Sequence, residues 1–382
     1  MRKNLTVLIA PLILGACVQD NRPSIAGNIN GVESDTLLVT YYPAGNMDAR
    51  KQDTIPMQQG RFSFEVNNDS VATEVYLMAK PSMKSIKKGV IAAMTIRAIP
   101  LMILPGESVN VTGSFEDYQI SGGKFYEEVN EANGQNREYT EKIRSLSKQA
   151  IALSKAKAPE DSIRKAYELI QEYTLKMADN KVEYIRQHPN SDASVYLTSM
   201  MPLEQLEKAL ALIGEQVKNG VLAPYYRNQM KVVERSRAMQ EAQNRIQPGK
   251  AAPDFTLKDL AGKDFTLSSL KGKYVILDFW GSWCGWCIKG FPELKKAYGK
   301  HKNKMEVVGI DCRDTEKKWK DAVEEHMLPW LNVRNEDNPD VTVMYAVSGY
   351  PTKILINPEG NISKIAVGED PAFYTYLDDL LK

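Results

Sequence analysis

A pair of cysteines directly after a buried strand constrains the fold of this chain more than any other feature. Residues 273–280 form an apolar run that predicts a strand, and Trp283-Cys284-Gly285-Trp286-Cys287 opens a predicted helix over residues 284–300. A strand that leads straight into a helix places Cys284 at the helix N-terminus, where the macrodipole and free backbone N–H groups stabilise a thiolate. Two intervening residues bring Cys287 one turn further on, within reach of a disulfide.

This arrangement suits thiol–disulfide exchange, in which a thiolate attacks a substrate disulfide and a second thiol resolves the mixed disulfide. We expect Cys284 to be exposed and nucleophilic, and Cys287 to be more buried and resolving. Half of a zinc site has the same spacing, but structural zinc takes four ligands and the chain has no second cysteine pair. Its three histidines are scattered, so the sequence predicts neither a metal nor another cofactor.

Composition excludes several classes of protein. With 382 residues, and roughly 100–200 residues per domain, two or three globular domains are expected. The chain has 49 Lys and Arg against 48 Asp and Glu, so it lacks the basic surplus of a nucleic-acid binder. The longest apolar run lies at the N-terminus and is too short to span a bilayer, which excludes a polytopic membrane protein.

The N-terminus has the order of a secretory signal: two basic residues, an apolar stretch over residues 5–14, and Leu14-Gly15-Ala16-Cys17. Small residues before a cysteine resemble the lipobox of bacterial lipoproteins. The resemblance implies a signal peptide over residues 1–16 and a lipid on Cys17, which anchors the mature protein to a membrane. Val18 stands where an inner-membrane retention signal has Asp, which favours the outer membrane, with the protein facing the periplasm. A plain secretory signal with an incidental cysteine is the alternative.

The rest of the chain divides into three regions. Residues 17–123 are β-rich and suggest a small antiparallel sandwich or barrel, with strands predicted over residues 24–30, 36–42, 61–66, 74–79, 94–103 and 108–113. Residues 124–247 have apolar residues at helical spacing. A Pro248-Gly249 break introduces residues 248–382, where strands and helices alternate as in an α/β domain. Further strands are predicted there over residues 305–311, 353–357 and 362–367, and helices over 316–326 and 371–382.

Residues 251–382 resemble the thioredoxin-fold domain of the TlpA/ResA-like thiol–disulfide oxidoreductases. The resemblance rests on Ala252-Pro253-Asp254-Phe255, the strand and cysteine string, Pro292, and Val347-Ser348-Gly349-Tyr350-Pro351-Thr352. It implies a thioredoxin fold, a kink of the active-site helix at Pro292, and a cis peptide bond before Pro351. The substrate-contact positions it implies are Trp283, Trp286, Tyr350 and Pro351.

Asp278 lies in the middle of the predicted buried strand, where an ionised carboxylate is costly. It occupies the place where thioredoxins keep a buried acid that accepts the proton of the resolving cysteine, and burial raises the pKa of such an acid. Several ResA-like relatives have an amide there, and an acid turned to solvent at a sheet edge is the alternative. Cys312 is expected to be a buried, inert thiol, with a third redox cysteine as the alternative.

The front of the chain has a weaker resemblance, carried by Gln52-Asp53-Thr54, Gln59-Gly60-Arg61-Phe62-Ser63-Phe64 and Leu104-Pro105-Gly106-Glu107-Ser108-Val109. These segments are similar to a small β domain of unknown function that commonly precedes thioredoxin domains in bacterial lipoproteins. This resemblance implies a domain arrangement and no activity.

The function expected from these features is a lipid-anchored periplasmic thiol–disulfide oxidoreductase that acts as a reductase. The family resemblance implies disulfides of exported proteins, such as apocytochrome c, as substrates, and a membrane electron donor of the DsbD/CcdA kind. An oxidase or isomerase with the same site is the alternative, because Gly285-Trp286 replaces the Gly-Pro of thioredoxin and leaves the reduction potential open. A binding or scaffold lipoprotein is another. A peroxiredoxin is disfavoured, because Gly281 stands where that family has Thr or Ser.

Overall fold

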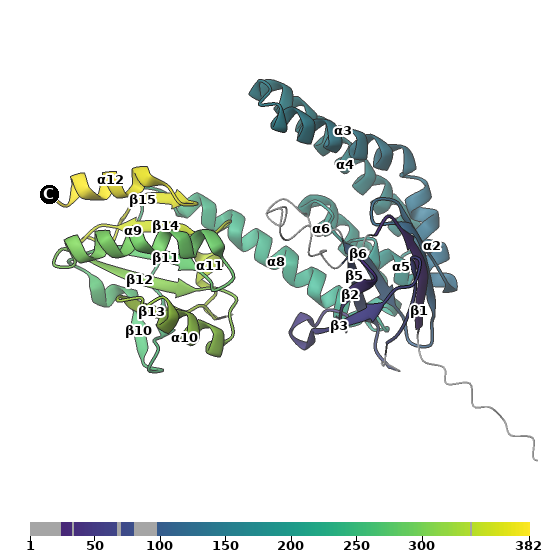
Figure 1. Ribbon diagram of the computed structural model, residues 1–382, viewed down its shortest axis with the longest axis horizontal. Coiled ribbons are helices and arrows are strands. Elements are labelled where there is room, and N and C mark those ends of the chain that lie inside the picture. Colours follow the sequence, from purple (N-terminus) through teal and green to yellow (C-terminus); the bar gives the residue numbers. More distant parts are fainter. Residues whose placement is uncertain (1–23, 33, 67–69, 80–97, 337) are drawn as a thin grey trace, which may run out of the picture. The chain divides into compact units, whose positions relative to one another are not determined.

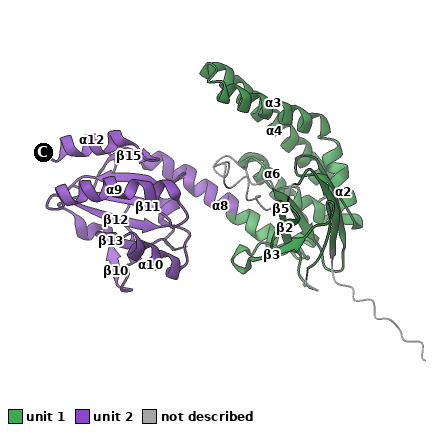
Figure 2. Cartoon of the chain, viewed as in Figure 1, with its two compact units in different colours: residues 1–231 green, residues 232–382 purple. Residues whose placement is uncertain are grey.

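The structure, a computed structural model, describes residues 24–382 except 33, 67–69, 80–97 and 337. The chain divides into two compact units, residues 1–231 and residues 232–382 (Figures 1 and 2). The predicted signal peptide, Cys17 and residues 94–97 of a predicted strand lie outside the described residues. In the described part of the chain, no helix is both long enough and apolar enough to cross a membrane.

The first unit contains two four-stranded sheets, with strand orders β4-β1-β7-β8 and β3-β2-β5-β6. The strands are β1 (Ser24–Asn30), β2 (Thr36–Pro43), β3 (Lys51–Pro56), β4 (Arg61–Glu65), β5 (Thr73–Ala79), β6 (Ala98–Ile103), β7 (Val109–Ser114) and β8 (Tyr118–Ser121), with a short 3-10 helix, η1 (Met47–Ala49). The predicted β region is confirmed, and its pairings are antiparallel except that between β1 and β7, which is parallel. A parallel pair needs a long connection, and the chain from β2 to β6 supplies it.

Helices follow the strands, as the apolar spacing predicts, and the last of them continues past residue 231 into the second unit. They are α2 (Gly123–Gly134), α3 (Arg137–Lys155), α4 (Glu160–Gln187), α5 (Asp192–Tyr196), α6 (Leu203–Leu212), α7 (Glu215–Lys218) and α8 (Ala223–Arg245). Strand residues such as Val39 and Leu77 share one hydrophobic core with Phe125, Ile185 and Tyr225 of the helices. The β-rich and helical sequence regions therefore fold together up to Lys231, because each buries its apolar face against the other.

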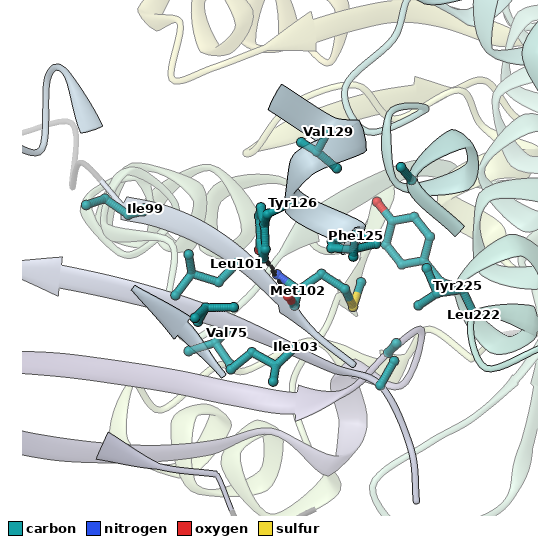
Figure 3. Packing of buried hydrophobic residues seen from close by; sticks show 14 of the residues in the cluster. Val75, Ile99, Leu101, Met102, Ile103, Phe125, Tyr126, Val129, Leu222 and Tyr225 are labelled. Atoms are coloured by element: carbon teal, nitrogen blue, oxygen red, sulfur yellow. Dashed lines mark hydrogen bonds between the residues drawn. The ribbon is translucent and has the colours of Figure 1, made fainter. Parts of the chain in front are cut away.

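Tyr126 of α2 forms hydrogen bonds with the backbone of strand β6 at the edge of its sheet. β6 has β5 as its one strand neighbour among the described residues. The Tyr126 hydroxyl accepts a hydrogen bond from the Met102 backbone N–H (2.8 Å) and donates one to the Met102 carbonyl (3.0 Å; Figure 3). All of these groups are buried, so the phenol satisfies two strand groups that water cannot reach.

Replacing Tyr126 with Phe is expected to lower the free energy of unfolding by about 1–3 kcal/mol, because it leaves a buried N–H and carbonyl without partners. Urea unfolding monitored by circular dichroism measures the change. Tyr167→Phe on the exposed face of α4 is the matched control and is expected to have no effect. Equal stability of the two variants would contradict the assigned role of the Tyr126 hydroxyl.

The second unit is built on a five-stranded sheet of order β13-β12-β11-β14-β15. β11 is central; it pairs in parallel with β12 and antiparallel with β14. The elements are β9 (Thr256–Lys258), β10 (Asp264–Thr266), η3 (Leu267–Leu270), β11 (Tyr274–Trp280), α9 (Gly285–His301), β12 (Met305–Asp311), α10 (Glu316–Glu325), β13 (Leu331–Arg334), α11 (Val341–Met344), β14 (Thr352–Ile356), β15 (Ile362–Val367) and α12 (Pro371–Leu380). The predicted alternation of strands and helices, and the hairpin of β14 with β15, are confirmed.

Each face of this sheet carries its own core. Helices α9, α10 and α12 pack on one face, with Ile276 and Trp280 of β11. The other face buries Leu277 and Phe279 with residues of β9, β10 and α11. Ile246, just after α8, also packs into this second core, so the unit begins before the Pro248-Gly249 break that marked the sequence boundary.

Candidate active site

The cysteine pair lies at the N-terminus of α9, directly after the central strand. Cys284 is the N-cap residue, and its Sγ accepts a hydrogen bond from the Cys287 backbone N–H (3.1 Å). The two cysteines form a disulfide. Cys284 is 6% exposed and Cys287 is 2% exposed, so the predicted order of accessibility is confirmed. The expectation of an exposed Cys284 is wrong for this oxidised state, because the residue packs into the core with Trp280 and Phe291.

The turn before the cysteines is fixed by Asp314. Ser282 donates two hydrogen bonds to this carboxylate, from its backbone N–H (2.6 Å) and its hydroxyl (2.8 Å). Gly281 has no room for a side chain, since a Cβ there would lie 2.5 Å from Trp283 Nε1 and 2.9 Å from the Cys312 carbonyl. A peroxiredoxin would require a Thr or Ser hydroxyl at this position, three residues before Cys284. Gly281 provides none.

An aromatic surface surrounds the disulfide. Trp283 and Trp286 are 48% and 66% exposed, and the Trp283 ring meets the Tyr350 ring edge-on at 5.1 Å. The Trp283 indole N–H donates to the Cys312 carbonyl (3.0 Å), which fixes the ring. The predicted cis bond between Tyr350 and Pro351 is present. The loop that carries Tyr350 therefore lies beside the N-terminus of α9, as the family resemblance implies.

Two cations that the sequence reasoning missed flank these rings. The Arg313 guanidinium lies 6.0 Å from the Trp283 ring centre and 5.7 Å from that of Tyr350. The Lys289 ammonium lies 4.6 Å from the Trp286 ring centre. Arg313 could have been found from its place just after β12, since the carboxyl ends of parallel strands gather at one edge of a sheet.

Asp278 is buried in the middle of β11, which excludes the sheet-edge alternative. Side chains alternate along a strand, so Asp278 shares the face of Ile276 and Trp280, where Cys287 packs. Burial raises the pKa of this carboxyl, and the Lys353 ammonium, 3.6 Å from Oδ1, opposes the rise. Lys353 is the residue opposite Asp278 on β14.

Cys312 is buried, as expected for an inert thiol. Its Sγ lies 3.4 Å from the Ile310 carbonyl, and burial raises its pKa to about 12. Little thiolate can therefore form at this position near neutral pH. In the described ranges, no cluster of His, Cys, Asp and Glu side chains could hold a metal ion.

Asp311, at the end of β12, gives the stability of the protein a dependence on pH. It is buried, and burial together with the neighbouring Asp314 raises its pKa from 3.8 to about 9. The folded state therefore keeps a proton that the unfolded state releases. The stabilising contribution is full below the unfolded pKa and is lost as pH rises through about 9.

We expect the free energy of unfolding of the native protein to fall between pH of about 5 and about 9. In Asp311→Asn this component of the fall should disappear, because the amide does not titrate. Denaturant unfolding of both proteins across this range is the measurement. Parallel pH profiles would contradict the assignment.

Thioredoxin-fold thiol–disulfide oxidoreductases are built in this way, and the comparisons with known proteins agree. Residues 248–365 match the AhpC/TSA family. Over 126 residues the chain is 36% identical to thiol-disulfide oxidoreductase ResA of Bacillus cereus, covering 33% of this chain and 72% of ResA. Over 124 residues it is also 36% identical to ResA of Bacillus subtilis, covering 32% of this chain and 69% of that ResA. The chain belongs to the ResA-like thiol–disulfide oxidoreductases and is an enzyme of that kind.

The solved thioredoxin domain of a thiol-disulfide oxidoreductase from Bacteroides vulgatus is also similar. It is 34% identical, with a TM-score of 0.34, and the match covers 36% of this chain and 99% of that domain.

Proposed function

We propose that this protein is a lipid-anchored reductase of disulfides in exported proteins. The observation that carries the proposal is the Cys284–Cys287 pair at the start of α9, with the buried Asp278 carboxyl on the same face of the sheet. In the reduced enzyme, the helix N-terminus stabilises the Cys284 thiolate, which attacks a substrate disulfide. Cys287 then gives its proton to Asp278 and attacks Cys284, and the substrate leaves as a thiol.

Substrate peptides are proposed to lie on the aromatic surface of Trp283, Trp286 and Tyr350. Exposed indole rings provide apolar contact, and the backbone at Tyr350, before the cis bond, is proposed to pair with an extended peptide in strand fashion. Electrons for repeated turnover are proposed to come from a membrane donor of the DsbD/CcdA kind. The disulfides of exported proteins, including apocytochrome c, are the proposed substrates.

Anchoring is proposed to occur through a lipid on Cys17, in the outer membrane and facing the periplasm. The support is the lipobox-like sequence before Cys17. Incorporation of labelled palmitate in cells, compared between the native chain and Cys17→Ala, tests it. Label in the native chain alone is expected, and equal labelling would exclude the lipid at this cysteine.

The direction of electron flow is tested by the reduction potential of the Cys284–Cys287 pair. A form that lacks residues 1–17 is equilibrated with thiol buffers, while the exposed Trp283 and Trp286 report the redox state by fluorescence. A value near that of thioredoxin, about −270 mV, is expected for a reductase. A value of about −120 mV would instead make the protein an oxidant, in which the same residues pass electrons in the opposite direction.

A further inference from the structure

A buried lysine lies between two carboxylates beneath the active-site helix. Lys353 of β14 is 3% exposed, and its Nζ lies 3.6 Å from Asp278 Oδ1 and 2.6 Å from Glu369 Oε2. Lysine is rarely buried without a partner, because removing an ammonium from water is costly. Lys353 is therefore held in place by the two acids, and it connects them.

The Glu369 carboxylate, which contacts Lys353, lies against Gly290 of helix α9, where the helix has no side chain. Glu369 follows β15, and its second oxygen, Oε1, accepts a hydrogen bond from the Tyr374 hydroxyl (2.9 Å). A Cβ built on Gly290 would overlap this carboxylate, so the absence of a side chain at Gly290 makes its position possible. Gly290 comes three residues after Cys287, on the same side of the helix and one turn further along.

Glu369 also borders solvent. A groove of about 720 Å³ between α9 and α12 is lined by Gly290, Glu369 and Tyr374. Charged groups that face Glu369 are Lys353 from β14, Asp278 from β11, the neighbouring Asp370, and Lys289 and Glu293 of the groove wall. Asp278 itself is buried, and its Oδ1 has no hydrogen-bond partner in the described part of the chain. Asp278, Lys353 and Glu369 thus form a row of charged groups that runs from the interior of the sheet unit to the groove.

We propose that Lys353 and Glu369 carry the proton of the resolving step from Asp278 to water in the groove, an inference that rests on the function proposed above. In that step Cys287 gives its proton to the Asp278 carboxylate, the Cys287–Cys284 bond forms, and the bond between Cys284 and the substrate sulfur breaks. The substrate leaves with the electron pair of that bond and takes a proton from water. The enzyme dithiol is oxidised and the substrate disulfide is reduced.

The proton on Asp278 is then transferred to water through Lys353 and Glu369, and no further reactant is needed. Lys353 passes an ammonium proton to Glu369 and takes the proton from Asp278. Glu369 releases its proton to water, and all three groups return to their starting charges. Lys353 and Glu369 do not touch the reacting sulfurs, so they act through Asp278.

The test is the rate of the resolving step in Glu369→Gln. The reduced full chain is mixed with hydroxyethyl disulfide, a small neutral probe, and the mixed disulfide on Cys284 is followed by mass spectrometry after acid quenching, from pH of about 6 to about 9. Because removal of a proton acceptor typically costs on the order of 10²-fold or more, resolution at least about tenfold slower than in the native chain is expected. The rate of attack by Cys284 should change by less than about twofold.

A matched control is Glu293→Gln, which removes the same charge from an exposed position of the same groove. It should resolve as the native chain does. Added imidazole should restore resolution in Glu369→Gln by taking the proton from the groove, which a purely structural defect does not allow. Resolution at the native rate at every pH, or slow resolution without rescue by imidazole, overturns the proton path. A native chain whose reduced Cys284–Cys287 pair is not oxidised by hydroxyethyl disulfide overturns the proposed function instead.

Gly290→Ala tests the path if Glu369→Gln does not fold. Alanine favours the helix, but its methyl group displaces the Glu369 carboxylate. Gly299→Ala in the same helix, where a Cβ meets open space, is the control. Slow resolution in Gly290→Ala alone supports the path, and equal rates in both variants overturn it.

Discussion

Reduction of insulin disulfides is expected to fall to the uncatalysed rate when Cys284 is replaced by serine. A serine hydroxyl is not ionised near neutral pH, even at a helix N-terminus, so the attacking thiolate is lost. The other cysteines in the described residues cannot take over: Cys287 is 2% exposed, and burial raises the pKa of Cys312 to about 12. Turbidity of the released insulin chains, with dithiothreitol as the electron source, measures the rate.

Cys312→Ala is the control for this experiment, because it removes a buried thiol that the site does not use. It should retain the native rate. Activity in Cys284→Ser, or its loss in Cys312→Ala, would contradict the roles given to these residues.

Cys287→Ala separates an enzyme from a scaffold. With the resolving thiol gone, a substrate stays on Cys284 as a mixed disulfide. We expect partners captured in cells to be released by a reducing agent. Partners that remain bound after reduction would favour the binding or scaffold alternative for the first two thirds of the chain.

The second large effect concerns stability. Lys353→Met is expected to lower the free energy of unfolding by about 3–5 kcal/mol, the usual cost of breaking a buried ion pair from one side. Asp278 and Glu369 would be left without the cation that lies between them. The loss should be largest at high pH and smaller in acid, because protonated carboxyl groups need no cation.

Urea unfolding at several pH values measures this loss. Lys296→Met, at an exposed position of α9 with a single ion-pair contact at 3.9 Å, is the control and should change stability little. Adding Asp278→Asn to Lys353→Met should recover part of the loss. A change below about 1 kcal/mol for Lys353→Met would show that the lysine contributes no more than a surface pair.

The local parts of the site could be predicted from the sequence. The apolar run before the cysteines predicts β11 to within one residue, and the helix that follows starts one residue from its predicted position. The cis bond before Pro351 was implied by the family resemblance of its loop, and it is present. These features depend on neighbouring residues, so a short stretch of sequence contains the information for each.

Other features depend on contacts between distant residues. β3 was missed because Ile55 is its one buried residue, so the strand shows no alternation of apolar and polar positions. Lys353 was given no role beyond the start of a predicted strand, although it directly precedes the apolar Ile354-Leu355-Ile356 and so could have been suspected of burial. Its partners Asp278 and Glu369 come from other elements of the sheet unit, and no spacing in the sequence connects them.

The missing side chain at Gly290 has a consequence for related sequences. Since a Cβ at this position and the carboxylate of residue 369 cannot occupy the same space, the two positions should vary together. Relatives with a larger residue at the position of Gly290 should have a shorter or uncharged residue at that of Glu369, and those with glycine should keep the acid. An alignment of homologues would thus record a contact between two residues that are far apart in the sequence and adjacent in the fold.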